Sequence, residues 1–179
     1  MFLAKSFQEE NSVGEHSKNK GGYSSSEKKE RIKKMTRIFY VDVAKSITDK
    51  EGKKYWKCSV VENKQNIINF ANSKAIWAVE AEAFAIMKTV FWLVEQKKQG
   101  EVIIYTDNIH AFNNQQSKCS IEQAKSNWQK GKTTKALYFI QLSKETAKKN
   151  NIQLTVKWIK GQDNPADYYS RWNNGKYKH

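Results

Sequence analysis

The chain of 179 residues contains 32 lysine and arginine residues and 18 aspartate and glutamate residues, which gives a formal net charge of +14. This length suits one domain with a substantial core, and the positive charge favours a polyanionic partner such as nucleic acid. No apolar run approaches the roughly 20 residues that span a bilayer, which excludes a membrane-spanning protein. The two cysteines form neither a disulfide framework nor a metal-binding spacing, which excludes a disulfide-stapled secreted domain. We expect a cytoplasmic monomer.

Residues 1–36 differ in composition from the rest of the chain. They are rich in serine, asparagine, lysine, glycine and glutamate and contain few apolar residues. Such a segment cannot bury enough surface to offset the entropy of ordering. Only eight basic and five acidic residues lie in it, so +11 of the charge lies after residue 36. We predict a disordered N-terminal arm at 1–36, a catalytic domain at 37–173 and a tail at 174–179.

Three β-rich segments open the predicted domain. Residues 37–46 alternate loosely between apolar and polar, and a turn signal follows at 49–52. Residues 55–61 and 65–70 have the same β-rich character. We predict that these three strands form an antiparallel meander.

The strongest helical pattern covers residues 75–98, where apolar residues recur at every third or fourth position. Gly100 is predicted to cap the end of this helix. Residues 102–106 are uniformly apolar, as expected of a central strand that is covered on both faces.

The last third of the chain contains two further helical patterns and one strand. Residues 108–132 are polar and are predicted to form short helices and a loop, whereas 133–150 read as an amphipathic helix and 152–159 as a strand. A terminal helix is predicted at 164–172, with an asparagine as N-cap and the only proline in its first turn. This order predicts an α/β fold with a mixed five-stranded sheet, three antiparallel strands followed by parallel strands, flanked by helices.

Four acidic residues lie in four separate predicted elements of this basic chain. Asp42 is in the first strand, Glu82 in the first helix, Asp107 just after the apolar strand and Asp167 in the terminal helix. A carboxylate inside or at the end of an apolar strand is costly unless a cation or hydrogen bonds receive it. Several carboxylates that converge repel one another and favour a divalent metal. The pattern therefore predicts a metal site beside a polyanion.

Taken singly, these residues also have structural explanations. Asp107 follows a strand, where an N-cap or turn aspartate is common. Asp167 could stabilise the positive end of the terminal helix. Glu80 lies two residues before Glu82 in the same helix, and helical periodicity does not separate the two as candidates. His110, close to Asp107, is expected at the surface.

The motifs around these acids resemble ribonuclease H type 1. They are an aspartate in the first strand, AEAFA in the first helix, YTDN after the fourth strand and WIKGQDNPADYYSR near the end, in the family's order. The last motif is most similar to the ribonuclease H domains of retroelements. The resemblance covers roughly residues 37–172. It implies an RNase H-like fold and a metal-dependent endonuclease that cuts the RNA strand of RNA–DNA hybrids, with a reverse transcriptase or other mobile-element protein as a possible partner.

The resemblance also implies a site with two Mg²⁺ ions, with Mn²⁺ as an alternative, held by Asp42, Glu82, Asp107 and Asp167. Asp42 would bridge the two ions. In such a site one ion activates water and the other stabilises the leaving oxygen. The family's alanine and aliphatic residue three and four places after the helical glutamate favour Glu82 over Glu80.

Polar and basic residues near these motifs are predicted to contact the substrate. The candidates are Asn72, Asn108, Trp128, Lys130 and Lys132. The two asparagines could read the 2′-hydroxyl groups of a hybrid. The segment around the other three resembles the basic protrusion that grips the DNA strand in many family members. Taken singly, the tryptophan could be a core aromatic and the lysines solvated charges.

Two other functions fit the same residues. One is a different nuclease on this fold, such as a junction resolvase or a single-strand nuclease. The other is a non-catalytic nucleic-acid-binding module, which would be expected to have lost one or more of the acids that are all present here. The loop at 160–164 lacks the histidine that many cellular members carry. Retroelement relatives lack it too, and slower turnover is expected.

Overall fold

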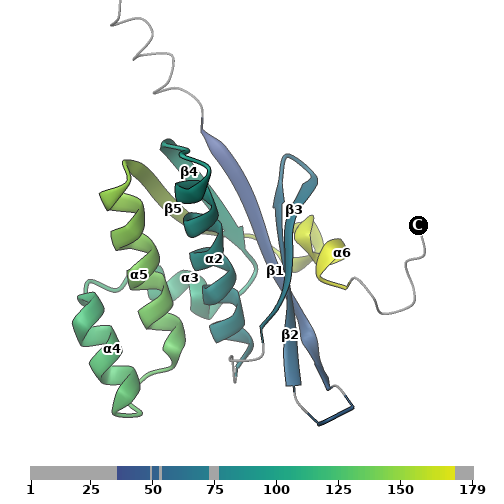
Figure 1. The fold of residues 1–179 in the computed structure, drawn as a ribbon, viewed down its shortest axis with the longest axis horizontal. Helices are drawn as coiled ribbons and strands as arrows, with labels where there is room; N and C mark the ends of the chain where they lie inside the picture. The colour runs from purple at the N-terminus through teal and green to yellow at the C-terminus, as the bar shows by residue number, and fades with distance from the viewer. Residues whose placement is uncertain (1–35, 49, 53, 73–76, 172–179) are drawn as a thin grey trace, which may run out of the picture.

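The computed structural model describes residues 36–48, 50–52, 54–72 and 77–171 (Figure 1). Almost all of the predicted arm at 1–36 and the whole tail at 174–179 lie outside these residues. The elements are β1 (Arg37–Thr48), β2 (Lys54–Glu62), β3 (Gln65–Asn72), α2 (Ala78–Glu95), β4 (Gly100–Thr106), α3 (Ile109–Gln115), α4 (Ile121–Gln129), α5 (Lys135–Lys149), β5 (Ile152–Trp158), a short 3₁₀ helix η1 (Gly161–Asp163) and α6 (Ala166–Ser170).

The five strands form one sheet in the order β3-β2-β1-β4-β5. β1 pairs antiparallel with β2, and β2 pairs antiparallel with β3. β4 pairs parallel with both β1 and β5. This is the RNase H-like mixed sheet that the sequence predicted, so the fold class is confirmed.

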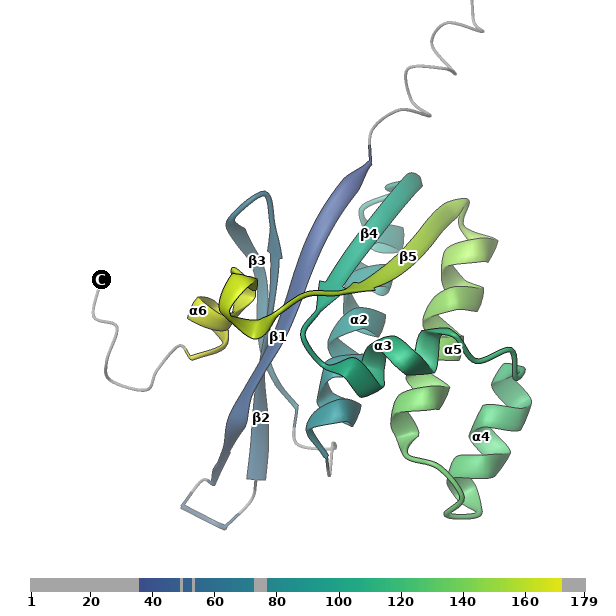
Figure 2. The ribbon, with the colours of Figure 1, turned by 180° about the vertical axis from the view of Figure 1, so that it is seen from behind.

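The helices cover the two faces of the sheet unequally. α2 and α5 pack side by side over one face, and α6 lies on the opposite face against β1 and β2 (Figures 1 and 2). The core between the sheet and α2 is built from fully buried side chains of both layers, including Phe39, Val41, Ile86, Leu93 and Ile104. Burying each such side chain stabilises the fold by roughly 1.5–3 kcal/mol before the entropy of ordering is counted.

The register of β1 and β4 positions two of the predicted site residues. The last pair in this parallel ladder is Tyr40 with Tyr105. Two residues further along both strands, Asp42 and Asp107 therefore lie next to each other. Because β1 is paired with β2 at this point, with Asp42 opposite Ser59, the aspartate is fixed within the sheet and not in a loop.

Two local predictions need correction. α2 ends at Glu95, and Gly100 is the first residue of β4, where its φ of +101° suits glycine. Gly100 therefore does not cap the helix. The polar segment after β4 contains short helices, as predicted, and they are α3 and α4. Within the described residues the terminal helix is shorter than predicted, because α6 begins after Asn164 and ends at Ser170.

Candidate active site

Three of the four predicted acids converge in the structure. Asp42 from β1, Glu82 from the first turns of α2 and Asp107 after β4 each place a carboxylate oxygen within 4.8 Å of the other two. Asp42 is 6% exposed and Glu82 is 3% exposed, whereas Asp107 is half-buried. The structure therefore brings these three predicted residues together, and their role as metal ligands stays a prediction.

The surroundings of Asp42 favour its protonated form. The pKa of Asp42 is raised to about 6, chiefly by burial; hydrogen bonds from the Ser170 hydroxyl and the Val43 backbone lower it, whereas the charges of Asp107 and Asp167 raise it. The Ser170 hydroxyl also lies 3.0 Å from the Asp167 carbonyl oxygen. Because a hydroxyl has one proton, Ser170 can donate to Asp42 or to Asp167 but not to both at once. A bound cation would reverse this balance by stabilising the charged carboxylate.

Glu82 is the most deeply buried acid of the three. Burial raises its pKa well above the usual range, and the charges of Asp42 and Asp107 add to this effect. The Thr106 hydroxyl opposes it by donating a 2.6 Å hydrogen bond to Oε1 of Glu82. Thr106 thereby also fixes the orientation of the glutamate from the end of β4.

Asp107 is held from several sides by the segment that follows β5. The side chain of Asn164 donates a hydrogen bond to its carboxylate, which lowers a pKa that burial raises. The indole Nε1–H of Trp158 donates to its carbonyl oxygen at 3.0 Å. A Cβ atom at Gly161 would lie 3.1 Å from Oδ2 of Asp107, so only glycine leaves the carboxylate undisturbed.

Substitution of Gly161 by alanine is expected to displace the Asp107 carboxylate by a few tenths of an ångström. Because catalytic geometry is sensitive to such shifts, we expect activity to fall on the order of tenfold, with a higher Mg²⁺ concentration at half-saturation and a nearly unchanged melting temperature. Gln162→Ala, at an exposed position of the same 3₁₀ helix, is the matched control. Identical metal titration curves for the two variants would contradict the proposed contact.

The structure distinguishes the two glutamates of α2. Glu80 is buried, and its Oε1 accepts a hydrogen bond of 2.9 Å from the backbone N–H of Lys135, the first residue of α5. A carboxylate there interacts favourably with the positive end of the helix. Glu80 therefore fastens α5 to α2, whereas Glu82 belongs to the acidic cluster.

Replacing each glutamate by glutamine is expected to give opposite results. Glu80→Gln should lower stability by about 1 kcal/mol through the lost charge at the α5 N-terminus, while activity per folded molecule stays unchanged. Glu82→Gln should remove nearly all activity yet raise the melting temperature of the metal-free protein, because one buried charge disappears. Thermal melts in chelator and cleavage rates at saturating Mg²⁺ measure both effects. Activity lost in Glu80→Gln and kept in Glu82→Gln would reverse the assignment.

Asp167 lies near the cluster but outside the three-residue group. Its Oδ1 accepts hydrogen bonds from Nε and Nη2 of Arg171, at 3.0 and 2.8 Å, one turn along α6. Its charge nevertheless raises the pKa of both Asp42 and Asp107. It therefore sits at the edge of the site, paired with a cation of its own.

The structure describes the side chain of Asn108 but not that of Asn72, the two asparagines predicted to contact the substrate. Asn108 is the N-cap of α3, and its Oδ1 accepts hydrogen bonds from the backbone N–H groups of His110 and Ala111, both at 3.1 Å. Any contact from Asn108 to nucleic acid would therefore use Nδ2. His110 is exposed, as expected. Asn72 is the last residue of β3, and its side chain lies outside the described residues.

Trp128 lies at the end of α4 and packs against α5. Its ring stacks on Tyr138 with centroids 6.0 Å apart, and Nζ of Lys135 lies 4.4 Å from the ring centroid. The ring remains partly exposed, and Lys130 and Lys132 are exposed in the loop that follows. The ring thus lies beside Lys135 and shortly before two exposed lysines in the chain, and contact of Trp128, Lys130 and Lys132 with nucleic acid stays a prediction.

Sequence reasoning missed two side chains that orient the acids. Thr106 holds Glu82, and Ser170 donates toward Asp42. It also treated Asn164 only as a helix cap, although its Nδ2 additionally donates to the Val41 carbonyl oxygen at 2.8 Å. The signal was present in the motifs YTDN and NPADYYSR, which contain all three residues.

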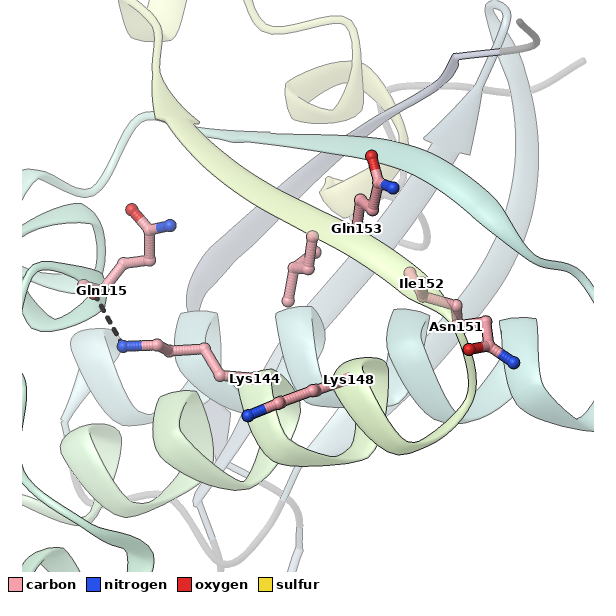
Figure 3. Close-up of a pocket in the computed structure, with 7 residues that line it drawn as sticks. Gln115, Lys144, Lys148, Asn151, Ile152 and Gln153 are labelled. Carbon is pink, nitrogen blue, oxygen red and sulfur yellow. Dashed lines mark hydrogen bonds between the residues drawn. The ribbon is translucent and has the colours of Figure 1, made fainter. Parts of the chain in front are cut away.

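A cavity of about 500 Å³ lies elsewhere, between α5 and β5 (Figure 3). Its lining residues are Gln115, Lys144, Lys148, Asn151, Ile152, Gln153 and Leu154. Nζ of Lys144 donates to the Gln115 carbonyl oxygen at 3.2 Å across one end of it. None of the site acids lines this cavity, so it is separate from the acidic cluster.

Three solved structures are similar to this chain. One is the N-terminal RNase H domain of a Mycobacterium tuberculosis protein, fused to maltose-binding protein, with 13% identity, a TM-score of 0.45 and coverage of 74% of this chain and 89% of that chain. The native prototype foamy virus protease–reverse transcriptase has 17% identity and a TM-score of 0.46, with coverage of 68% of this chain and only 17% of that chain. A foamy viral protease–reverse transcriptase in complex with double-stranded DNA has 16% identity, a TM-score of 0.48 and coverage of 76% and 92%.

No family model and no curated protein matches the sequence. Within the described residues, none of the helices combines the length and the apolar character that crossing a membrane requires. The mixed five-stranded sheet helps bring together an acidic cluster that could hold a metal ion.

Proposed function

We propose that this protein is a metal-dependent endonuclease that hydrolyses the RNA strand of RNA–DNA hybrids. The observation that carries the proposal is the convergence of Asp42 in β1, Glu82 in α2 and Asp107 just after β4, with oxygen atoms within 4.8 Å of one another. The carboxyl ends of strands in such a sheet are the expected location of a catalytic site. The strongly basic chain around this acidic cluster suits a polyanionic substrate.

The donor set fits a hard divalent cation. All three side chains offer carboxylate oxygens, which Mg²⁺ and Mn²⁺ prefer over softer ligands. Burial and the charges of neighbouring acids raise the pKa values of all three carboxyl groups. Bound cations would stabilise the charged carboxylates and so offset both effects. We propose two ions per site, held by these three residues and by Asp167. When bound, the ions supply positive charge for the attacking water and the leaving oxygen of the phosphodiester.

The protein's own contribution is to orient the carboxylates. Thr106 holds Glu82 through its hydroxyl, Asn164 holds Asp107 through its amide, and Ser170 donates toward Asp42. Because these partners are themselves on the sheet or on the α6 segment, the carboxylates keep their geometry before substrate arrives. Such preorganisation lowers the reorganisation required during the reaction.

Substrate contacts are proposed for the polar and basic residues around the site. Trp128, Lys130 and Lys132 would contact the DNA strand, and Asn108 would use its Nδ2 group toward a 2′-hydroxyl. Asn72 remains a candidate from its sequence position alone. Association with a reverse transcriptase or another mobile-element protein, and a cytoplasmic location, also remain predictions.

A cleavage panel tests this proposal. The substrates are one labelled sequence as RNA–DNA hybrid, double-stranded RNA, double-stranded DNA and each single strand, with Mg²⁺, Mn²⁺ or chelator. We expect cleavage of the RNA in the hybrid only, in either metal, and none in chelator. Glu80→Gln serves as the matched control for Glu82→Gln. Cleavage of double-stranded DNA, or cleavage without metal, would favour another nuclease; no cleavage at all would favour a binding module.

A further inference from the structure

Trp158 is an exposed aromatic residue beside the acidic cluster. Its exposed fraction is 43%, which is a large apolar area to leave in water. Scattered exposed apolar side chains need no explanation, but those of the described residues are not scattered. The four large ones are Trp77, Ile109, Trp158 and Tyr168. Trp77 immediately precedes α2, the helix that carries Glu82. Ile109 and Tyr168 closely follow Asp107 and Asp167 in the chain. Trp158 donates a hydrogen bond to Asp107.

The orientation of the Trp158 ring is fixed. Trp158 is the last residue of β5 and pairs with Thr106 at the end of β4. The backbone N–H of the next residue, Ile159, donates to the Thr106 carbonyl oxygen at 3.0 Å. The indole Nε1–H donates to the Asp107 carbonyl oxygen, also at 3.0 Å. An aromatic ring held in this way loses little conformational entropy when a ligand packs on it.

The segment after Trp158 passes close to Asp107. In Figure 2 the chain that joins β5 to α6 passes the end of β4 and crosses β1 on its way to α6. Gly161 in this segment contacts the Asp107 carboxylate without a side chain in between. Lys160 is exposed and makes no ion pair with any residue in the described part of the chain. A ring of fixed orientation therefore lies next to Asp107, and an exposed lysine follows it two positions later in the chain.

We propose that Trp158 contacts the substrate directly, packing its indole against the sugar or base of a nucleotide next to the bond that is cut. An aromatic ring beside a lysine is the arrangement by which proteins bind a nucleic-acid strand without reading its sequence. Lys160 would neutralise a neighbouring phosphate. This inference rests on the proposed function and adds a strand contact on the β5 side of the acids, distinct from the α4 side that carries Trp128.

Equilibrium binding tests the inference without cleavage. The parent protein carries Asp42→Asn, and a fluorescently labelled RNA–DNA hybrid is titrated in Mg²⁺. Trp158→Leu in this background is expected to raise Kd roughly five- to a hundredfold, the range of one base–aromatic stack. Trp158→Phe, which keeps an aromatic ring but loses the hydrogen bond, should change Kd less than about threefold. A Kd for Trp158→Leu within twofold of the parent, or no hybrid binding by the parent, would overturn the inference.

A second measurement covers the case in which Trp158→Leu fails to fold. The six tryptophans of the otherwise unaltered Asp42→Asn chain are replaced by 5-fluorotryptophan, and the resonance missing in Trp158→Phe identifies Trp158. We expect this ¹⁹F resonance to shift or broaden when hybrid is added; an unchanged resonance would reject the contact.

The two proposals fail separately. If the wild-type protein cleaves hybrid but Trp158→Leu binds it normally, only the contact is rejected. If the wild-type protein cleaves nothing but Trp158→Leu weakens binding, the nuclease proposal fails and the contact stands.

Discussion

Replacement of Asp42 by asparagine is expected to abolish measurable hydrolysis of the hybrid, a loss of roughly a thousandfold or more. Asp42 is one of the three acids of the cluster, and its ligand atom lies within 4.8 Å of those of both Glu82 and Asp107. An asparagine fits the same space and can still accept a hydrogen bond from Ser170, so the fold should be retained. Single-turnover cleavage at saturating Mg²⁺ measures the effect.

Hybrid binding by the same variant should stay equal or become tighter. One negative charge is removed beside the phosphate backbone, so repulsion decreases. Gln162→Ala, which changes an exposed residue near the site, controls for nonspecific damage. Turnover retained in Asp42→Asn with Mg²⁺ would remove Asp42 from the proposed mechanism.

Metal-free protein is expected to lose stability as the pH rises from about 5 to 8. Burial raises the pKa of Asp42 to about 6 from its ordinary value of 3.8, so the native state binds this proton more tightly than the unfolded state does. The resulting stabilisation is complete below the unfolded pKa and is lost as the pH rises through 6. For Asp42 alone, the full shift corresponds to on the order of 3 kcal/mol, of which about half is lost above pH 5. Glu82 and Asp107 shift in the same direction.

Mg²⁺ should restore this lost stability at pH 8, because a cation that binds the native state stabilises it by mass action. Thermal melts at pH 5 and pH 8, with Mg²⁺ and with chelator, measure both effects. Other groups also titrate over this range, so the informative quantity is the difference between the wild-type protein and Asp42→Asn. The variant should melt higher than the wild-type protein at pH 8 in chelator and respond less to Mg²⁺. If the wild-type protein and Asp42→Asn gave equal melting curves in all four conditions, the charged form of Asp42 would not destabilise the metal-free protein.

The sheet could be predicted because its signals are local. The alternation in β1, β2 and β3 and the apolar run of β4 each depend on a few neighbouring residues. The polar stretch before α5 has no such periodicity. Its two short helices, α3 and α4, begin instead at side-chain caps, Asn108 and Ser120, and caps alone are a weak signal in a segment rich in polar residues.

The features of the site also fall into two groups: those that local sequence patterns predict, and those that depend on parts of the chain far away in sequence or on side-chain geometry. The acids could be found because they interrupt apolar patterns and match a known family's motifs. Helical periodicity did not separate Glu80 from Glu82, and the family's motif favoured Glu82. The structure adds a physical reason, because the Lys135 N–H group at the start of α5 donates to Glu80. The pairing of Asp167 with Arg171 and the anchoring of Trp158 to Asp107 likewise depend on side-chain geometry, which residue spacing does not determine.

Asn164 joins parts of the chain that are far apart, because its partner Val41 lies 123 positions earlier. Ser59 makes a similar long-range bond to the Ala166 carbonyl oxygen, at 2.7 Å. During synthesis, a ribosome would therefore have completed all five strands before the groups that orient Asp42 and Asp107 emerged. A nascent or truncated chain that ends before residue 161 would possess Asp42, Glu82 and Asp107 but not their alignment. The protein would thus remain inert toward nucleic acid in the vicinity of its own translation until the domain is nearly complete.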